Sequence, residues 1–512
     1  MSRSLLRSTA VVSAMTFVSR VLGFVRDVII ARAFGAGLAT DAFFVAFRIP
    51  NLLRRLFAEG AFSLAFVPVF AEYRERHAGE LRDLVDRVTG TLSLILLAVT
   101  VVGVLAAPGL VLVFAPGFAD NAAQSELTAA MLRLTFPYLL FVSLTACAGG
   151  MLNSYGRFAV PALTPALLNI VLILAAVWLA PQLEQPITAL AWGVLIAGIA
   201  QLAVQLPFLY RLGLLPRPRW GWHYPGVQRI LKLMLPTLFG SSVAQINLLF
   251  DTLLASLLVT GSVSWLYYSD RLLEFPLGVF GVALGTVILP KLSREHASAS
   301  ASDFNRTLDW ALRWALLIGL PASVALAVLA GPLLVSLFQY GAFTAEDARM
   351  AQRSLIAFAF GLQAFILIKV LAPGFYARQD TRTPVRIGII AMVSNMGLNL
   401  LLIWPLAHAG LALATTLAAC LNAGLLYRNL RATGIYCPEP GWPGFLLSLL
   451  VANLVLGLAL WWLGGGIDAW LAATVGQRVA WLAWLVPTGA ALYAGVLLAT
   501  GLRPHQLLRA TG

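Results

Sequence analysis

The chain has 512 residues and a formal net charge of +13; 60% of its residues are hydrophobic and 11% are charged. Soluble globular proteins carry about 25% charged residues, so this composition and a mean hydropathy of +0.85 exclude a soluble protein and indicate a polytopic membrane protein. The Lys and Arg residues are scattered through short connections between apolar runs. The positive charge therefore indicates membrane topology and argues against a nucleic-acid-binding face.

Apolar runs of about 20 residues, the length that crosses a bilayer as a helix, occur fourteen times and predict an all-α membrane protein. Arg20 and Arg26 interrupt the first run, and no small-residue cleavage site closes it, so we expect it to remain as a span and not to be removed as a signal peptide. The second run contains Pro50, which predicts a break or a bend. The predicted spans are 8–33, 39–70, 88–115, 127–152, 159–180, 187–210, 230–258, 264–290, 308–337, 350–376, 384–404, 409–430, 443–464 and 479–501.

Basic residues follow every even-numbered predicted span up to the twelfth, whereas the opposite connections are nearly free of them. Arg349 and Arg478 are the exceptions. Because cytoplasmic loops carry the excess of Lys and Arg, this alternation predicts that both termini face the cytoplasm. We expect a multi-pass membrane protein in this orientation.

Segments of the first half match segments of the second half, in order, at an offset of about 222 residues. FVPVFAEYRE (66–75) corresponds to ILPKLSRE (288–295), and SYGRFAVPA (154–162) corresponds to FYARQDTRTPV (375–385). Each half holds an even number of spans, so the two halves share one orientation about a pseudo-two-fold axis along the membrane normal. The predicted organisation is a six-helix lobe at 1–211, an interfacial linker rich in Arg, Trp and Pro at 212–229, a second six-helix lobe at 230–431, and two additional C-terminal helices at 432–512.

Charged residues gather in and beside the first two spans and recur in the eighth and tenth. A charge at bilayer depth costs about 2.5–3.5 kcal/mol on insertion scales, so it needs a partner or a water-filled cavity. The excess of positive charge predicts an anionic ligand between the lobes, and the planar guanidinium favours phosphate or pyrophosphate oxygens. The candidate substrate-binding residues are Ser19, Arg20, Arg26, Asp27, Asp41, Asn51, Arg54, Glu59, Asp270, Arg271, Glu274 and Lys369.

The alternative interpretation of these charges is that Arg residues pair with Asp or Glu and fasten helices to one another. For the Arg26–Asp27 pair, Asp41 and Glu59 both interpretations stay open. For Arg20, Arg54 and Arg271 we favour ligand binding, because ion pairing requires no surplus of positive charge.

A second group of polar residues consists of a carboxylate, two amides and a hydroxyl inside apolar spans. Oxygen atoms of this kind are the ligands of a hard cation such as Na⁺, so we consider a sodium site that would couple an ion gradient to transport. The alternative is hydrogen bonding between spans, a common use of Asn and Thr in membranes. The residues are Asp251, Asn395, Asn399 and either Thr415 or Thr416.

Enzyme motifs are absent from the sequence. It contains no Walker A loop, so ATP-driven transport is not expected. It also contains no G-x-S-x-G motif, no H-E-x-x-H motif and no paired Cys and His spacing. The five His residues lie in predicted connections or tails, where we expect them to be solvated: His77, His223, His296, His408 and His505.

Long stretches of the chain resemble the MurJ (MviN) family of bacterial lipid II flippases, in the multidrug/oligosaccharidyl-lipid/polysaccharide exporter superfamily. They include MTFVSRVLGFVRDVIIARAFGAG, TDAFFVAFRIPNLLRRLFAEGAFSLAFVPVFAEY, SWLYYSDRLLEFPLGVFGVALGTVILP and LAPGFYARQDTRTPV. The resemblance implies a two-lobe, fourteen-helix transporter that moves the undecaprenyl-pyrophosphate-linked disaccharide-pentapeptide from the cytoplasmic to the periplasmic leaflet for peptidoglycan synthesis. It also implies a lipid-tail groove formed by the last two spans.

Carried onto this chain, the resemblance assigns the central cationic residues to Arg20, Arg26, Arg54 and Arg271, and an essential acid to Asp41. The resemblance also implies that Asp251, Asn395, Asn399 and Thr415 lie where some members of the family hold sodium. The expected partners are lipid II and membrane lipids, with no ATP and no nucleic acid, and we expect a monomer without a required cofactor, driven by Na⁺ or by the membrane potential.

Three alternatives remain open at this point. A flippase for another polyprenyl-pyrophosphate glycan would use the same cationic residues. A drug/cation antiporter of the same superfamily would require an acidic cavity, whereas these residues are mostly basic. A membrane enzyme acting on polyprenyl phosphates would require clustered acids to hold Mg²⁺, and no such cluster occurs in the sequence.

Overall fold

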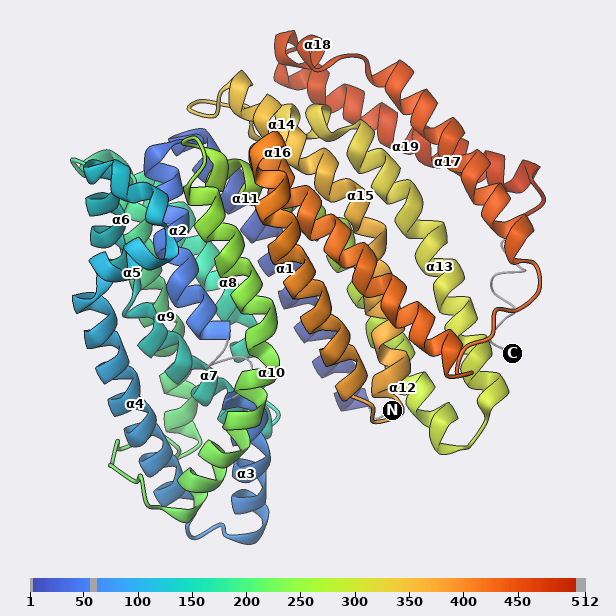
Figure 1. Cartoon of the computed structure of the whole chain (residues 1–512). Helices are drawn as coiled ribbons and strands as arrows, with labels where there is room; N and C mark the ends of the chain where they lie inside the picture. The colour runs from blue at the N-terminus through green and yellow to red at the C-terminus, as the bar shows by residue number, and fades with distance from the viewer. Residues whose placement is uncertain (1–2, 56–61, 503–512) are drawn as a thin grey trace. The chain divides into compact units, whose positions relative to one another are not determined.

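The computed structural model describes residues 3–55 and 62–502, and side chains from residue 12 onward except at 236–244. The described chain is all helical, with no strand in it, as the apolar runs predict. It divides into two compact units, Met1–Ser264 (unit 1) and Trp265–Gly512 (unit 2). The helices of each unit are labelled in Figure 1.

Unit 1 is a stack of long helices that pack side by side. α1 lies along α8, α2 packs against α6 and α7, and α3 packs against α7 and α10. α10, which begins the predicted second lobe, packs against α3, α4 and α5 of unit 1, and the lobe boundaries stay a prediction. Its helices are α1 (Arg3–Phe34), α2 (Leu38–Arg54), α3 (Ser63–Arg76), α4 (Leu81–Leu105), α5 (Ala107–Phe114), α6 (Ala122–Thr135), α7 (Tyr138–Ser154), α8 (Ala159–Leu174), α9 (Thr188–Arg211), α10 (Pro225–Ser256) and the first turn of α11 (Ser262–Pro276).

Unit 2 is organised around α15, which packs against α12, α13, α14 and α16. The C-terminal helices α17 and α19 pack against each other; α17 contacts α13, and α19 contacts α14. Many of their large apolar side chains are exposed, as expected for a pair of helices that faces lipid. The helices are α12 (Val282–Ala297), α13 (Ala301–Val328), α14 (Ala330–Phe338), α15 (Ala345–Tyr376), α16 (Arg382–Ala432), α17 (Trp442–Gly464), α18 (Ile467–Ala472) and α19 (Val475–Ala499).

α16 contains two of the predicted spans in one element of 51 residues. The helix bends at Ala407, whose φ of 49° and ψ of −131° are not helical, two residues after Pro405. The bend falls in the predicted connection between spans 384–404 and 409–430. Gly410 is required there, because a Cβ atom at that position would lie 2.2 Å from the carbonyl oxygen of Leu402.

Ten helical segments of the described chain are long and apolar enough to cross a membrane. The predicted total of fourteen spans stays a prediction. The described part of the second apolar run consists of α2, which continues past Pro50 to Arg54, and α3, which begins at Ser63.

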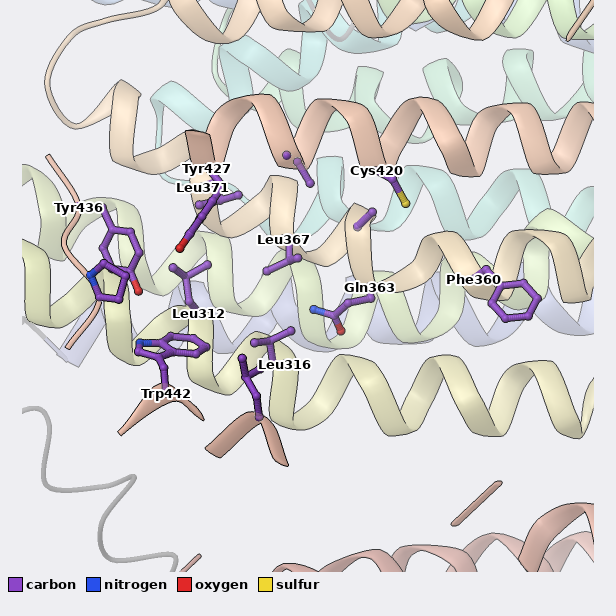
Figure 2. A pocket seen from close by; sticks show the side chains of 15 residues that line it. Leu312, Leu316, Phe360, Gln363, Leu367, Leu371, Cys420, Tyr427, Tyr436 and Trp442 are labelled. Atoms are coloured by element: carbon purple, nitrogen blue, oxygen red, sulfur yellow. The ribbon is translucent and has the colours of Figure 1, made fainter. Parts of the chain in front are cut away.

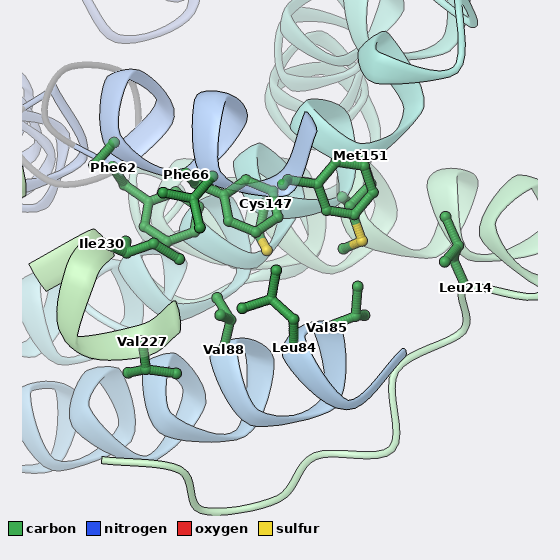
Figure 3. Close-up of a cluster of buried hydrophobic side chains, with 14 of the residues drawn as sticks. Phe62, Phe66, Leu84, Val85, Val88, Cys147, Met151, Leu214, Val227 and Ile230 are labelled. Carbon is green, nitrogen blue, oxygen red and sulfur yellow. The ribbon is translucent and has the colours of Figure 1, made fainter. Parts of the chain in front are cut away.

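The core of unit 1 is clearest where α3, α4, α7 and α10 meet (Figure 3). Phe62 and Phe66 stack with ring centroids 5.1 Å apart. Val88 of α4 and Ile230 of α10 are buried in the same cluster. Apolar residues at helical spacing on all four helices supply this contact.

Candidate functional site

The first candidate residues lie where α1 packs on α8. The Arg26 guanidinium donates to Asp27 Oδ1 from Nη2 at 2.6 Å and from Nε at 2.9 Å, and to Asn169 Oδ1 from Nη1 at 2.9 Å. The Asn169 amide in turn donates to the carbonyl oxygen of Ser19 at 2.9 Å. Arg26 is 5% exposed and Asp27 is 1% exposed. The Arg26–Asp27 pair lies within α1, and the Arg26–Asn169 hydrogen bond links α1 to α8.

Arg20 lies one to two turns before this pair on α1 and is exposed, and Ser19 beside it is half-buried. An exposed guanidinium on a helix that holds a buried ion pair on another face can reach a ligand. The spacing of Arg20 and Arg26 on α1 therefore separates one accessible cation from one that is buried.

Asp41 lies in the first turn of α2 and binds the N-terminal end of α11. Its Oδ2 accepts from the Gly261 amide at 2.6 Å, and its Oδ1 accepts from the Ser264 amide at 2.8 Å and the Ser264 hydroxyl at 2.5 Å. Asp41 is 1% exposed. A carboxylate that accepts from orphan amides of a helix start is stabilised by those hydrogen bonds and by the helix dipole.

The C-terminal part of α2 carries two further arginines. Arg54 Nε donates to Asn51 Oδ1 at 2.9 Å, and the side chain is half-buried. Arg48 Nη1 donates to Thr252 Oγ1 of α10 at 2.6 Å. Arg48 was not among the candidate substrate-binding residues, and its hydrogen bond identifies it as a link between α2 and α10. Glu59 lies outside the described residues.

Arg271 of α11 is the arginine of unit 2 that the sequence predicts to bind the substrate. Its Nη1 pairs with Glu274 Oε2 at 2.7 Å, and its Nε and Nη2 each lie 3.2 Å from the Tyr267 hydroxyl, whose ring centroid is 5.2 Å from the guanidinium carbon. The Arg271 side chain is 35% exposed and the Glu274 side chain is 48% exposed. Asp270 is half-buried, and Lys369 of α15 is exposed. This part of unit 2 therefore presents accessible cations.

The residues considered for sodium divide between the units. Asp251 of unit 1 accepts from Asn247 Nδ2 at 3.4 Å. Asn395 and Asn399 of α16 are buried in unit 2, and the Thr415 hydroxyl donates to the Leu411 carbonyl at 3.0 Å. Within the described ranges no three His, Cys, Asp or Glu side chains gather as metal ligands. The sodium site stays a prediction.

An apolar pocket of about 600 Å³ lies in unit 2 between α13, α15, α16 and the start of α17 (Figure 2). Leu312, Leu367, Cys420 and Trp442 are among its lining residues. Gln363 lies at its wall as a polar side chain. Its size and its apolar lining suit a hydrocarbon chain.

The structure corrects two sequence-based expectations. His408 is 3% exposed, and its Nδ1 lies 2.6 Å from the Ser354 hydroxyl, because the bend of α16 turns it inward. Arg478, which the sequence placed in a connection before the last span, is also buried: α19 begins at Val475 and includes it. Its guanidinium donates to the carbonyl oxygens of Trp470 at 2.9 Å and Val335 at 3.2 Å.

Comparison with known families gives a consistent result. A family model described as "Lipid II flippase MurJ" matches residues 30–476. A probable lipid II flippase MurJ of Vibrio cholerae is 50% identical over 518 residues, covering 100% of this chain and 99% of that protein. The lipid II flippase MurJ of Burkholderia cenocepacia is 44% identical, with 98% of each chain covered.

Solved structures agree with the sequence relatives. A lipid II flippase MurJ in an inward closed conformation has a TM-score of 0.79 and 28% identity, covering 95% of this chain and 97% of that chain. An inward-facing MATE multidrug transporter of the MOP superfamily has a TM-score of 0.68 at 13% identity, covering 81% and 95%, and shares the fold alone.

Proposed function

The chain belongs to the MurJ family of lipid II flippases, and we infer from this membership that it is a membrane transporter that moves lipid II and is not an enzyme. The observation that carries this function is the match of the family model over residues 30–476 together with 50% identity over the whole chain. We propose that transport runs from the cytoplasmic to the periplasmic leaflet of the inner membrane, with both termini cytoplasmic and the chain acting as a monomer without ATP.

The proposed headgroup site uses the accessible arginines. Arg20, Arg54 and Arg271 would contact the pyrophosphate, because each has an exposed or half-buried side chain and a guanidinium can bind two phosphate oxygens at once. Arg26 would act as a positioning residue, since Asp27 orients its guanidinium and its hydrogen bond to Asn169 links α1 to α8.

The proposed tail site is the apolar pocket between α13, α15, α16 and the start of α17. A polyprenyl chain is pure hydrocarbon, and burying it there removes apolar surface from water or from contact with polar headgroups. Support for this assignment comes from the pocket's volume of about 600 Å³ and from the leucine residues that line it.

The proposed mechanism is alternating access. Asp41 would stabilise one state, because three hydrogen bonds to Gly261 and Ser264 fix the start of α11. The driving force would be the membrane potential, at about 2.3 kcal/mol per charge per 100 mV, or Na⁺ bound near Asp251 or near the buried Asn395 and Asn399.

Native mass spectrometry of the purified full-length protein tests the substrate. Lipid II is compared with an undecaprenyl-pyrophosphate that carries a different glycan, each with the wild-type chain and with Arg54→Ala. Preferential binding of lipid II that falls in the variant supports the proposal. Equal binding of the two lipids would replace it with a flippase of broader glycan range, and binding of neither would favour a drug/cation antiporter.

A further inference from the structure

A short segment of unit 1, residues 217–222, lies as a strap across α4. The Arg217 amide donates to Asp86 Oδ1 at 2.7 Å, and the Arg219 amide donates to the Asp86 carbonyl at 3.0 Å. The Gly221 amide donates to Thr91 Oγ1 at 3.0 Å. Three backbone donors of the strap are thus bound to one helix, so the strap is fixed to α4 over more than one turn.

Two glycines allow this close contact. A Cβ atom at Gly90 of α4 would lie 2.2 Å from the carbonyl oxygen of Arg219, and a Cβ atom at Gly221 would lie 2.5 Å from Cβ of Arg87. A larger residue at either position would therefore push the strap away from α4. Glycine at positions 90 and 221 therefore allows the strap to pack directly against α4.

The outer surface of the strap is basic and aromatic. Trp220 and Trp222 are 53% and 41% exposed, and their rings stack with centroids 6.0 Å apart and planes 8° apart. Arg217 and Arg219 are exposed beside them. Trp together with Arg is the composition that accumulates at the headgroup level of a bilayer.

An apolar cavity of about 450 Å³ lies beside the strap, between α4, α7 and α10. Trp222 lines it together with residues of α4 from Val88 to Val99. The α4 residues recur at helical spacing, so they form one face of the helix over about 16 Å. The hydrocarbon core of one leaflet is about 15 Å thick, and the cavity therefore matches the depth of one acyl chain.

The charge around the cavity is positive. Lys232 of α10 is exposed and lines it, and none of the described residues that line it is acidic. Of the nearby acids, Asp83 pairs with Arg87 at 2.8 Å, and the Asp86 carboxylate accepts the Arg217 amide at 2.7 Å. Asp86 keeps its negative charge, which the exposed Arg217 and Arg219 of the strap outnumber. A lipid with its chain in the cavity would place its phosphate near a cationic side chain and near the exposed arginines of the strap.

We propose that this cavity is a binding site for an anionic glycerophospholipid, with one acyl chain against the face of α4 and the phosphate beside Lys232 and the strap. The positive charge selects an anionic headgroup over a zwitterionic one. All residues of the site belong to unit 1, and none is among those proposed to bind lipid II, so the proposal stands apart from the transport function.

Native mass spectrometry of the full-length protein with phosphatidylglycerol or phosphatidylcholine of identical acyl chains tests the site. We expect stronger binding of phosphatidylglycerol, a severalfold loss of that preference in Lys232→Ala, and weaker binding of both lipids in Leu92→Trp, which fills the cavity. The matched controls are Lys291→Ala in unit 2 and Leu97→Trp, which lies on the opposite, exposed face of α4. Both controls should bind as the wild-type chain does.

Photolabelling of the wild-type protein gives a second measurement that does not depend on a variant that folds. Phosphatidylglycerol with a diazirine in its acyl chain should label peptides that contain 88–99 and 227–235. Labelling confined to other helices, equal binding of the two lipids, or binding that Leu92→Trp leaves unchanged would each overturn the proposal. Displacement of the label by a neutral polyprenol but not by unlabelled phosphatidylglycerol would also overturn it.

Discussion

Arg26 of unit 1 and Arg271 of unit 2 were both predicted as substrate-binding cations, and the structure gives them different surroundings. The Arg26 side chain is 6% exposed and bound to Asp27, whereas the Arg271 side chain is 35% exposed and its acidic partner Glu274 is more exposed still. The Arg26 guanidinium donates its hydrogen bonds to Asp27 and to Asn169, which links α1 to α8. The Arg271 guanidinium stays accessible.

The difference shows that an intramembrane arginine can serve a transporter in two ways. A buried ion pair stabilises little in net terms, but it becomes costly when one partner is removed, because the remaining charge stays buried. An accessible pair is weak, and a ligand that carries more negative charge can replace the carboxylate. Variants of the two arginines should therefore fail by different routes.

The largest effect is expected at the buried pair. Asp27→Ala should lower the free energy of unfolding by about 3–5 kcal/mol, because Arg26 would remain buried without its counter-charge. Denaturant unfolding in mixed micelles measures the change. The double variant Arg26→Met, Asp27→Leu is the matched control and should lose less than the single variant. An equal loss in both would contradict the fastening role of the pair.

Arg271→Ala sharpens the other side of the comparison. A hydrogen bond to a charged group contributes about 1.5–3 kcal/mol, so losing the guanidinium should weaken lipid II binding by about 10–100-fold. The folded protein should persist in the membrane. Native mass spectrometry measures the affinity for lipid II, and a proteoliposome assay measures its translocation. Arg271→Lys should retain part of the affinity. Unchanged binding in the alanine variant would remove Arg271 from the site.

Asp41 tests whether a buried acid that accepts hydrogen bonds from a helix start follows the same rule. Asp41→Ala leaves the Gly261 and Ser264 amides without their acceptor and should cost about 1–3 kcal/mol of stability. Thermal unfolding of the purified protein measures it. Ser264→Ala removes one of the three hydrogen bonds and should cost less. A larger loss in the serine variant would show that the carboxylate is not what fixes the start of α11.

The smallest stability effects are expected at Arg349 and Arg478 of unit 2, one exposed and one buried. Arg349 pairs with Asp468 at 2.8 Å on the surface, so Arg349→Ala should change stability by less than about 1 kcal/mol. Arg478→Met, which leaves several backbone carbonyl oxygens without a donor, should cost more. Their melting temperatures, compared side by side, decide the point. Equal shifts would mean that burial does not distinguish the two.

Much of the fold followed from periodicity and charge placement. The fourteen apolar runs each overlap a helix that the structure describes, including both halves of α16, because length and hydropathy are properties of a segment by itself. The start of α15 is also local in origin, because the Thr344 and Asp347 side chains form a capping box three residues apart.

The candidate site was less accessible to sequence reasoning. Arg26 and Asp27 are adjacent in sequence, which suggested a pair, but the third partner Asn169 lies 143 residues from Arg26. The Gly261 and Ser264 amides that bind Asp41 gave no signal either, because every residue except proline has an amide. His408 and Arg478 looked like loop residues, and only the bend of α16 and the early start of α19 bury them.

The sequence by itself determined the membrane class, the helical segments and the family, because each depends on composition and on motifs that can be read within one stretch of chain. The tertiary structure decided which charges are buried and which are accessible. Burial and hydrogen bonding depend on neighbours brought from distant parts of the chain, as Asn169 is brought to Arg26 and the strap at 217–222 is brought to α4. The physical reason is that the free energy of a charge depends on its surroundings and not on its residue type.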